Sequence, residues 1–423
     1  MLLPALATAH SHAFQRALRG RAQRPSAFLT SASTSATSAS TSGRTPPRED
    51  FWTWRGEMYT LASSLTPESI HDISRVAFAE LARAGVRTVG EFHYVHHQPG
   101  GAPYDDRTVM ADAVIRAAKD AKVRIALLRV AYNRGGDGRP PEEEQRRFCD
   151  PSVDDVLRDV DALRAKYAAD PDVVVGLAAH SVRAVPPDWL GPLRDYAAKY
   201  AIPLHMHVSE QEREVQECVS ETGRRPVELL ADNGVLSDRF VAVHATHLRP
   251  HEARLLGTAR AFVCVCPTTE RDLGDGLADL TALRQAGVRL CTGVDSHVLV
   301  DPLEDLRALE THERLRTHAR VTFGGGPSPE AGETPAESLW RSGSTEGEAA
   351  CGFKDSGGMI AISPDHPELA LVAPELLLDA VVFGCTRAVL SPPPGETRPS
   401  IPGLPGASRP GDSAPLPCPL RSG

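Results

Sequence analysis

The 423-residue sequence predicts an α/β protein that folds as a (β/α)8, TIM-like barrel. Eight short apolar runs alternate with amphipathic segments between residue 1 and about residue 300. Eight such alternations over this length fit a closed barrel better than an open doubly wound sheet. No GxGxxG motif follows any of the runs, which weakens the alternative of a nucleotide-binding sheet.

The predicted strands are short runs rich in β-branched and other apolar residues, as expected for strands buried in a parallel sheet. In chain order they are LLPALATA (2–9), GVRTVGEFHYV (85–95), VRIALLRVAY (123–132), DVVVGLAAH (172–180), IPLHMHV (202–208), RFVAVHA (239–245), AFVCVC (261–266) and GVRLCTGVD (287–295).

Helices are predicted between these runs, where apolar residues recur with a period near 3.6. Pro, Asp or Ser often opens such a segment, and Gly or Asn often closes it. The clearest examples are residues 67–84, 106–122 and 152–169.

Composition suggests how the chain is divided. We expect the barrel to occupy residues 1–323, with a low-complexity, Ser-rich insert at 26–50 that is disordered. Residues 324–390 are poorly patterned and are interpreted as a remnant of the barrel end and of a small β-domain. The Pro- and Gly-rich tail at 391–423 is also expected to be disordered.

Charge and hydropathy exclude some classes of partner. The net charge of −9 argues against nucleic acid, and no apolar run approaches the ~20 residues that would span a membrane. An anionic substrate would therefore need local cationic groups. The eight cysteines show no zinc-ribbon spacing, so we expect a reduced, cytoplasmic compartment. The first 48 residues lack Asp and Glu, which leaves organellar targeting as an alternative.

Polar residues mark the ends of the predicted strands, which is where barrels gather their functional groups. His10 and His12 are two residues apart, so on an extended strand their side chains point to the same side. The residues at the ends of later runs are Tyr94, His180, His205, His207, His244 and Asp295. Coincidence does not explain so many histidines at these places.

This pattern predicts a metal site. Two imidazoles from the first run, one from the fifth and the carboxylate of Asp295 make a donor set of three nitrogens and one oxygen. Such a set suits one Zn²⁺ per chain, and also Fe or Mn. One position remains for water, whose pKa falls to ~7 on zinc. His205 and His207 share a face, so periodicity does not separate them; we choose His207.

Several stretches of the sequence also resemble a known family. They are AHSHAFQRALRG, FWTWRGEMY, EFHYVHH, AHSVRAV, PLHMHVSEQEREV, VHATHL, CPTTERDLGDG and GVDSHVLVDPLEDLR. Together they resemble the amidohydrolase superfamily and, within it, the formimidoylglutamate deiminases. Family members carry a small β-domain before the first barrel strand, which is expected to be truncated or eroded here.

The resemblance implies roles for individual residues. His10, His12, His207 and Asp295 would bind the metal, His244 would hydrogen-bond the water on it, and Glu210 would move protons, with Asp295 sharing in catalysis. The residues implied to bind the substrate are Gln15, Arg55, Tyr94, His180 and Arg183. The implied reaction, a step of histidine degradation, converts N-formimino-L-glutamate and water to N-formyl-L-glutamate and ammonia.

The residues themselves agree with this chemistry. Hydrolysis of a formimino group needs a nucleophilic hydroxide, a base to generate it and an acid for the departing ammonia. The substrate is a small dicarboxylate, and two arginines can each hold a carboxylate through two hydrogen bonds. Arg183 directly follows the fourth run, and Arg55 lies beside FWTW. Arg55 has a simpler interpretation, as a surface cation stacked on Trp52 or Trp54.

Two other functions stay open at this stage. Another zinc deaminase of the superfamily, acting on guanine or a related base, would favour aromatic stacking and amide contacts over two arginines. Alternatively, the chain is an inactive remnant that binds a metal or ligand or does not fold. The sequence leaves the oligomeric state open, including a homodimer.

Overall fold

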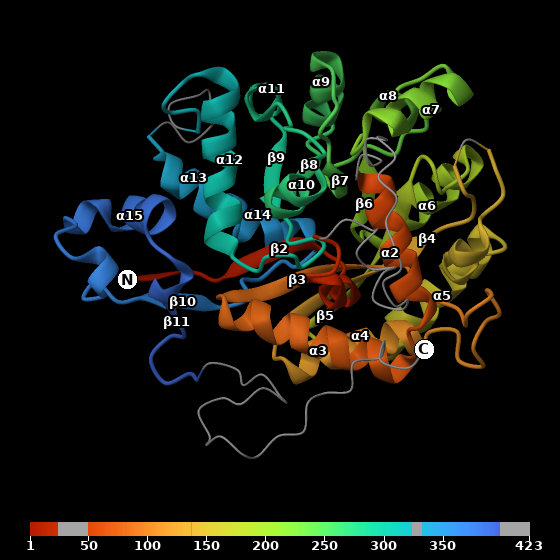
Figure 1. Cartoon of the computed structure of the whole chain (residues 1–423), viewed down its shortest axis with the longest axis horizontal. Coiled ribbons are helices and arrows are strands. Elements are labelled where there is room, and N and C mark those ends of the chain that lie inside the picture. The colour runs from red at the N-terminus through yellow and green to blue at the C-terminus, as the bar shows by residue number, and fades with distance from the viewer. Residues whose placement is uncertain (24–49, 137, 324–331, 398–423) are drawn as a thin grey trace, which may run out of the picture.

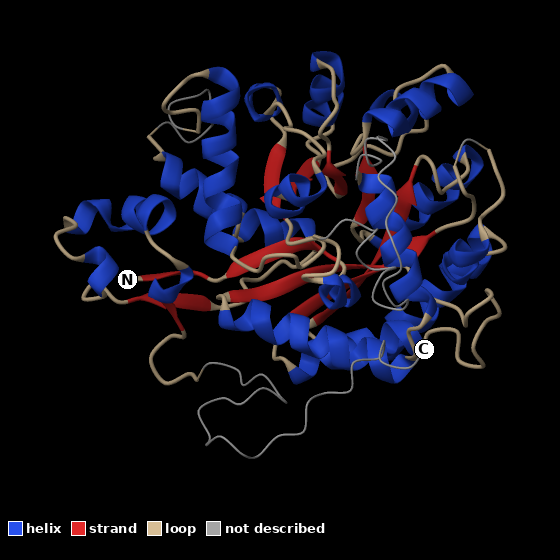
Figure 2. Cartoon of the chain, in the orientation of Figure 1, coloured by secondary structure: helices blue, strands red, loops and turns tan. Residues whose placement is uncertain are grey.

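The computed structural model describes residues 1–23, 50–136, 138–323 and 332–397. Its centre is a sheet of eight parallel strands that follow one another in chain order, surrounded by helices (Figures 1 and 2). The last strand returns to the first through a parallel bridge between Ser11 and Asp295, which closes the barrel. The predicted (β/α)8 fold is therefore confirmed.

The eight barrel strands coincide with the eight predicted runs. Their bounds are β2 (Leu6–Ser11), β3 (Val86–His93), β4 (Arg124–Ala131), β5 (Val173–Ser181), β6 (Leu204–Val208), β7 (Phe240–His244), β8 (Phe262–Val265) and β9 (Arg289–Thr292).

Helices cover the outside of the barrel and occupy the loops at its mouth. The three clearest predicted helices, at 67–84, 106–122 and 152–169, are all present. The helices are η1 (Ala13–Leu18), α2 (Phe51–Ser63), α3 (Pro67–Arg83), α4 (Val109–Asp120), η2 (Glu143–Phe148), α5 (Val153–Tyr167), α6 (Pro187–Tyr200), α7 (Glu212–Thr222), α8 (Pro226–Asp232), α9 (Pro250–Thr258), α10 (Pro267–Leu273), α11 (Leu280–Gln285), α12 (Pro302–Thr317), α13 (Pro335–Ser342), α14 (Thr345–Ala350), η3 (Pro367–Leu369), η4 (Pro374–Leu376), α15 (Leu377–Gly384) and η5 (Arg387–Val389).

The first predicted run, residues 2–9, is split between two sheets. Its start forms β1 (Leu2–Pro4), which pairs antiparallel with β10 (Met359–Ile362), and β10 pairs in turn with β11 (Leu390–Ser391). Pro4 has no backbone N–H to donate, so a continuous ladder through this point is disfavoured. The resulting three-stranded sheet lies beside the barrel, next to the N-terminus (Figure 1).

Helices from the poorly patterned region close the N-terminal end of the barrel. Ala7 of β2 donates its backbone N–H to Gly343 just after α13. Within the barrel, Cys351 packs with Cys264 and Cys291 in one buried apolar cluster. These cysteines are free thiols, and burial raises the pKa of each well above its usual value, so they behave as small core residues.

Both segments expected to be disordered fall mostly outside the described residues, and each needs a correction at its edge. Asp50 is the N-cap of α2, because its carboxylate accepts the N–H groups of Trp52 and Thr53. Ser391 belongs to β11, and Glu396 forms an ion pair with Arg87 at 2.7 Å. No described helix has both the length and the apolar character needed to cross a membrane.

The packing around Gly293, inside the barrel, leaves no room for even one additional methyl group. A Cβ on Gly293, just after β9, would lie 2.7 Å from the Cβ of His10 and 2.8 Å from Cys266 Sγ. We expect Gly293→Ala to lower the free energy of unfolding by ~1–3 kcal/mol, the usual effect of overpacking. Urea denaturation measures this change.

Gly56→Ala is the matched control, because that glycine lies within α2 and an added Cβ would meet nothing within 4 Å. This substitution should leave stability unchanged or raise it by up to ~1 kcal/mol, since alanine favours helix. Equal stability of the Gly293 variant and the parent would contradict the described packing.

Candidate active site

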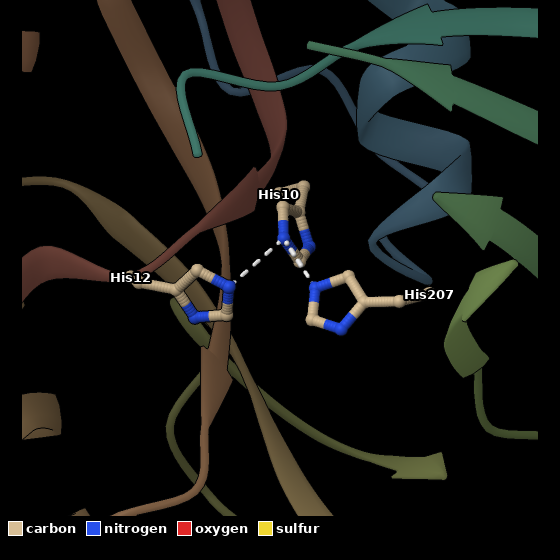
Figure 3. Close-up of side chains that lie close together, drawn as sticks. All are labelled: His10, His12 and His207. Atoms are coloured by element: carbon tan, nitrogen blue, oxygen red, sulfur yellow. Dashed lines mark hydrogen bonds between the residues drawn. The ribbon is translucent and has the colours of Figure 1, made fainter. Parts of the chain in front are cut away.

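Three imidazoles meet at the mouth of the barrel (Figure 3). The Nε2 atoms of His10 and His12 are 3.2 Å apart, and those of His10 and His207 are 3.1 Å apart. The carboxylate of Asp295 completes the group, with Oδ1 at 3.5 Å from His10 Nε2 and 3.4 Å from His12 Nε2. All four residues are buried.

The protonation of this group fits a bound cation. Burial lowers the pKa of His10 to about 3 and lowers those of His12 and His207, so all three rings are neutral at pH 7. His12 Nδ1 donates to the carbonyl of Phe92 at 2.9 Å, which leaves a lone pair on its Nε2. Nitrogen lone pairs and a carboxylate gathered this closely suit a divalent metal ion.

The carboxylate is held in its charged form. Burial alone would raise the pKa of Asp295, but its hydrogen bond with His10 and its electrostatic interactions with His10, His12 and His244 hold it below its ordinary range. The ionised carboxylate therefore supplies an anionic oxygen ligand at neutral pH.

Strained backbone directs several of these side chains into the mouth. Ser209, His244 and Asp295 follow or end three different strands, and their φ angles are 52°, 70° and 52°. A non-glycine residue in this left-handed region costs of order 1–3 kcal/mol and persists only where the surroundings enforce it. Such strain is typical of functional sites.

A second group of side chains fixes the loop that carries His12. Ser11 Oγ donates to Glu91 Oε2 at 2.6 Å and lies 2.8 Å from His297 Nε2, which donates to it. Glu91 Oε1 accepts the backbone N–H of Ala13 at 2.8 Å. The residues on both sides of His12 are thus tied to β3, and sequence reasoning did not identify this group.

His244 lies among carboxylates. Its Nδ1 is 3.2 Å from Glu270 Oε1, and its Nε2 is 3.6 Å from Glu210 Oε1 and 3.8 Å from Asp295 Oδ2. Burial lowers the pKa of His244, but these neighbours outweigh it and raise the pKa to about 10. Burial raises the pKa of Glu210 to about 7. Glu210 is therefore suited to proton transfer near neutral pH, whereas His244 stays protonated there.

One cavity joins this group to the predicted substrate residues. Ten residues predicted for the site line it. They are His12, Gln15, Arg55, Tyr94, His180, Arg183, His207, Glu210, His244 and Asp295. His10 lies behind them and is fully buried. Their roles stay predictions, but the structure brings all of these residues together.

The two arginines differ in their surroundings. Arg183 is buried, with Nη2 at 3.8 Å from Glu210 Oε2 and Nε at 3.6 Å from Glu214 Oε2. Arg55 stacks on Trp52, with its Cζ 4.6 Å from the ring centre, as expected for a cation packed on an aromatic ring. It nevertheless also lines the cavity. Among the described residues Arg55 has no carboxylate partner, so its charge remains available to a ligand.

Two histidines near the assigned ones in the sequence, His205 beside His207 and His247 beside His244, point elsewhere. His205 Nε2 lies 2.9 Å from the carbonyl of Ala350, at the closed end of the barrel. His247 Nε2 lies 2.9 Å from the carbonyl of Asp275. Both contacts are structural, which favours His207 and His244 for the site.

Sequence reasoning missed the aromatic and apolar part of the cavity wall. These residues are Phe51, Trp54, Met58, Tyr59, Tyr132, Phe148 and Leu273. The α2 members recur at helical spacing and so mark one face, a signal that was available in the sequence. Tyr132 directly follows β4, but it reads as the last apolar residue of its run.

Comparison with known proteins identifies the family. A model described as the amidohydrolase family matches residues 1–363. The chain belongs to the amidohydrolase family. Formimidoylglutamate deiminase of Pseudomonas aeruginosa is 34% identical over 388 residues, which cover 90% of this chain and 80% of that protein. The resemblance inferred from the sequence is therefore confirmed, and the protein is a hydrolase acting on C–N bonds.

More distant relatives share parts of the chain or its fold. The 8-oxoguanine deaminase of P. aeruginosa is 29% identical over 64% of this chain and 59% of its own length. An amidohydrolase from Brucella melitensis superposes with a TM-score of 0.79 at 30% identity, covering 92% of this chain and 84% of that structure. A zinc-containing adenosine deaminase from Xanthomonas campestris, 21% identical, shares the fold with a TM-score of 0.71, covering 92% of this chain and 77% of that structure.

Two histidines of β6 provide a matched test of the metal site. His207→Ala removes a donor, so metal bound per chain should fall well below one equivalent after dialysis, as measured by plasma mass spectrometry. His205→Ala removes an equally buried imidazole that contacts only the closed end of the barrel, and it should leave metal content unchanged. Metal loss from the His205 variant alone would show that the wrong histidine has been assigned.

Proposed function

We propose that this protein hydrolyses N-formimino-L-glutamate to N-formyl-L-glutamate and ammonia, using one Zn²⁺ per chain. The observation that carries the proposal is one cavity lined both by the metal-donor group and by two guanidinium groups, Arg55 and Arg183. The donor group suits hydrolysis of the formimino carbon, and the arginines suit the two carboxylates of the substrate. The similarity to formimidoylglutamate deiminase supports the same reaction.

The metal would be held by His10, His12, His207 and Asp295. When bound, zinc acts as a Lewis acid that lowers the pKa of water and so supplies a nucleophile at neutral pH. Neutral imidazoles and an ionised carboxylate are the forms that such a ligand set requires, and they are the forms these residues adopt.

Glu210 would move the protons, and His244 would orient the water. Water adds its oxygen to the formimino carbon, the bond from this carbon to the terminal nitrogen breaks, and both water protons leave on ammonia. Glu210, whose pKa is about 7, can accept one proton from the attacking water and return it to the departing nitrogen. His244, held against Glu270 at 3.2 Å, would keep the water oriented toward Glu210.

The substrate carboxylates would be bound at the cationic side of the cavity. The chain carries a net charge of −9, so a dianion is repelled at long range and must be held by local charges. Arg55 lacks a carboxylate partner within the described part of the chain, which makes it suited to pair with a ligand. Gln15 carries a buried, unpartnered Oε1 that can accept an N–H group of the substrate.

A deaminase of guanine-type bases is the second candidate, because aromatic rings including Phe51, Trp54 and Tyr59 line the same cavity. Ammonia release from N-formimino-L-glutamate, guanine and 8-oxoguanine by the purified, zinc-loaded protein decides between them. Turnover of formiminoglutamate alone supports the proposal. Turnover of a base alone, or of none of the three, would refute it.

His244 and its near neighbour His247 give a second test. His244→Asn should retain metal, because the residue contacts the donor group without belonging to the three-histidine cluster. Its kcat should fall by ~10²–10⁴, because the water is then no longer oriented toward Glu210 for proton transfer. His247→Asn should change kcat far less. Loss of metal from the His244 variant would make it a ligand instead.

The arginine proposal is tested by Arg183→Met. Truncating one partner of a buried charge pair costs ~2–5 kcal/mol, so kcat/KM for formiminoglutamate should fall by at least ~30-fold. Arg213→Met is the control, because Arg213 stacks on Trp52 at 4.2 Å but does not line the cavity. Equal kcat/KM in the Arg183 variant and the control would remove Arg183 from substrate binding.

A further inference from the structure

We propose that Tyr59 and Tyr132, oriented by Gln145, form a hydrogen-bond-donating subsite for a carboxylate of the substrate. The proposal deepens the function proposed above and rests on it. Both tyrosines line the cavity, and Gln145 lies behind them with 1% of its surface exposed. Gln145 is therefore a positioning residue, which acts on the ligand through the two phenols.

The hydrogen bonds of Gln145 fix the orientation of its amide. Its Oε1 accepts the backbone N–H of Glu142 at 2.8 Å, and its Nε2 donates to the hydroxyls of Tyr59 at 3.0 Å and Tyr132 at 2.7 Å. A backbone N–H can only donate, so the amide oxygen must face Glu142 and the NH₂ group must face the phenols. The assignment of nitrogen and oxygen is thus settled by the network.

This arrangement leaves a hydroxyl hydrogen for a ligand. Both phenol oxygens accept from Gln145, so neither hydroxyl can donate back to it. The two hydroxyls also interact with each other, which accounts for at most one of their two hydrogens. The other hydrogen has no acceptor among the residues that the structure describes. Because both tyrosines line the cavity, an acceptor in the cavity can take it.

Tyr132 keeps its hydroxyl hydrogen at working pH. Burial raises the pKa of Tyr132 well above its ordinary value of 10, and the neighbouring Tyr59 raises it further. A hydroxyl donor binds an anionic acceptor more strongly than a neutral one.

Cationic groups surround the same place. Arg55 lies over the ring of Tyr59, with Cζ 5.3 Å from the ring centre, and Arg183 is close enough to interact electrostatically with both phenols. The positive charge of Arg183 is already shared with Glu210 and Glu214, at 3.8 and 3.6 Å, so Arg183 alone does not balance the charge of a buried carboxylate. The phenol hydroxyls add hydrogen-bond donors beside the two cations, which makes a carboxylate the ligand that fits.

Glutarate, a dicarboxylate without the formimino group, is the probe. Its affinity for the zinc-loaded full-length protein is measured by titration calorimetry. Tyr59→Phe and Tyr132→Phe should each weaken glutarate binding by ~10–100-fold, because a hydrogen bond to a charged group is lost. Gln145→Met should weaken it similarly, since the hydroxyls can then turn away from the cavity. Tyr196→Phe removes a hydroxyl that donates to Asp161 outside the cavity, so this control should bind normally.

Kinetics separate positioning from a merely structural role. With N-formimino-L-glutamate, KM should rise in the Tyr59, Tyr132 and Gln145 variants by a larger factor than kcat falls, whereas distortion of the metal site would lower kcat first. Unchanged glutarate affinity and KM in both tyrosine variants would overturn the subsite.

The two proposals fail in different ways. A parent protein that binds glutarate, loses it in the tyrosine variants and yet releases no ammonia from formiminoglutamate retains the subsite and refutes the function. A parent that turns over formiminoglutamate, with tyrosine variants that bind glutarate equally well, retains the function and refutes the subsite. A parent that does not bind glutarate also refutes the subsite.

Discussion

The closure of the barrel between its last and first strands is the constraint on which the site depends. Asp295 donates its backbone N–H to the carbonyl of His10 at 3.1 Å, and its own carbonyl accepts the N–H of His12 at 2.9 Å. This exchange fixes the register of residues that are nearly 300 positions apart. It places the carboxylate against both imidazoles and defines the edge of the cavity. Ser11, between the two histidines, points the other way and is held by Glu91, so the ladder cannot slip without breaking that contact.

Burial and charge then divide the titratable groups by function. Where burial dominates, as at His10 and His207, the rings stay neutral and can act as ligands. Where carboxylates converge, as around His244, the ring is held protonated near neutral pH. The pKa of Glu210, about 7, lies between that of His10 and that of His244. One barrel mouth thus provides ligands, an orienting group and a proton carrier, because each meets a different balance of desolvation and charge.

Much of this architecture could be predicted from the sequence, because the relevant signals are local. Apolar runs marked the eight strands, and the two-residue spacing of His10 and His12 placed both side chains on one face. The sequence did not separate His205 from His207, since both face the interior and only depth along the barrel distinguishes them. The role of Gln145 was equally hidden, because it depends on a loop that brings distant residues together. Pairing of a short terminal strand with β10 is also non-local, so the division of the first run was missed.

The central claim is that His10, His12, His207 and Asp295 surround one metal ion. Anomalous diffraction from crystals of the zinc-loaded protein, collected above and below the zinc absorption edge, tests it directly. The account predicts one strong peak per chain that appears only above the edge, within ~2.0–2.2 Å of three histidine nitrogens and one carboxylate oxygen. A peak at another place, or no peak in a protein that still releases ammonia, would contradict it.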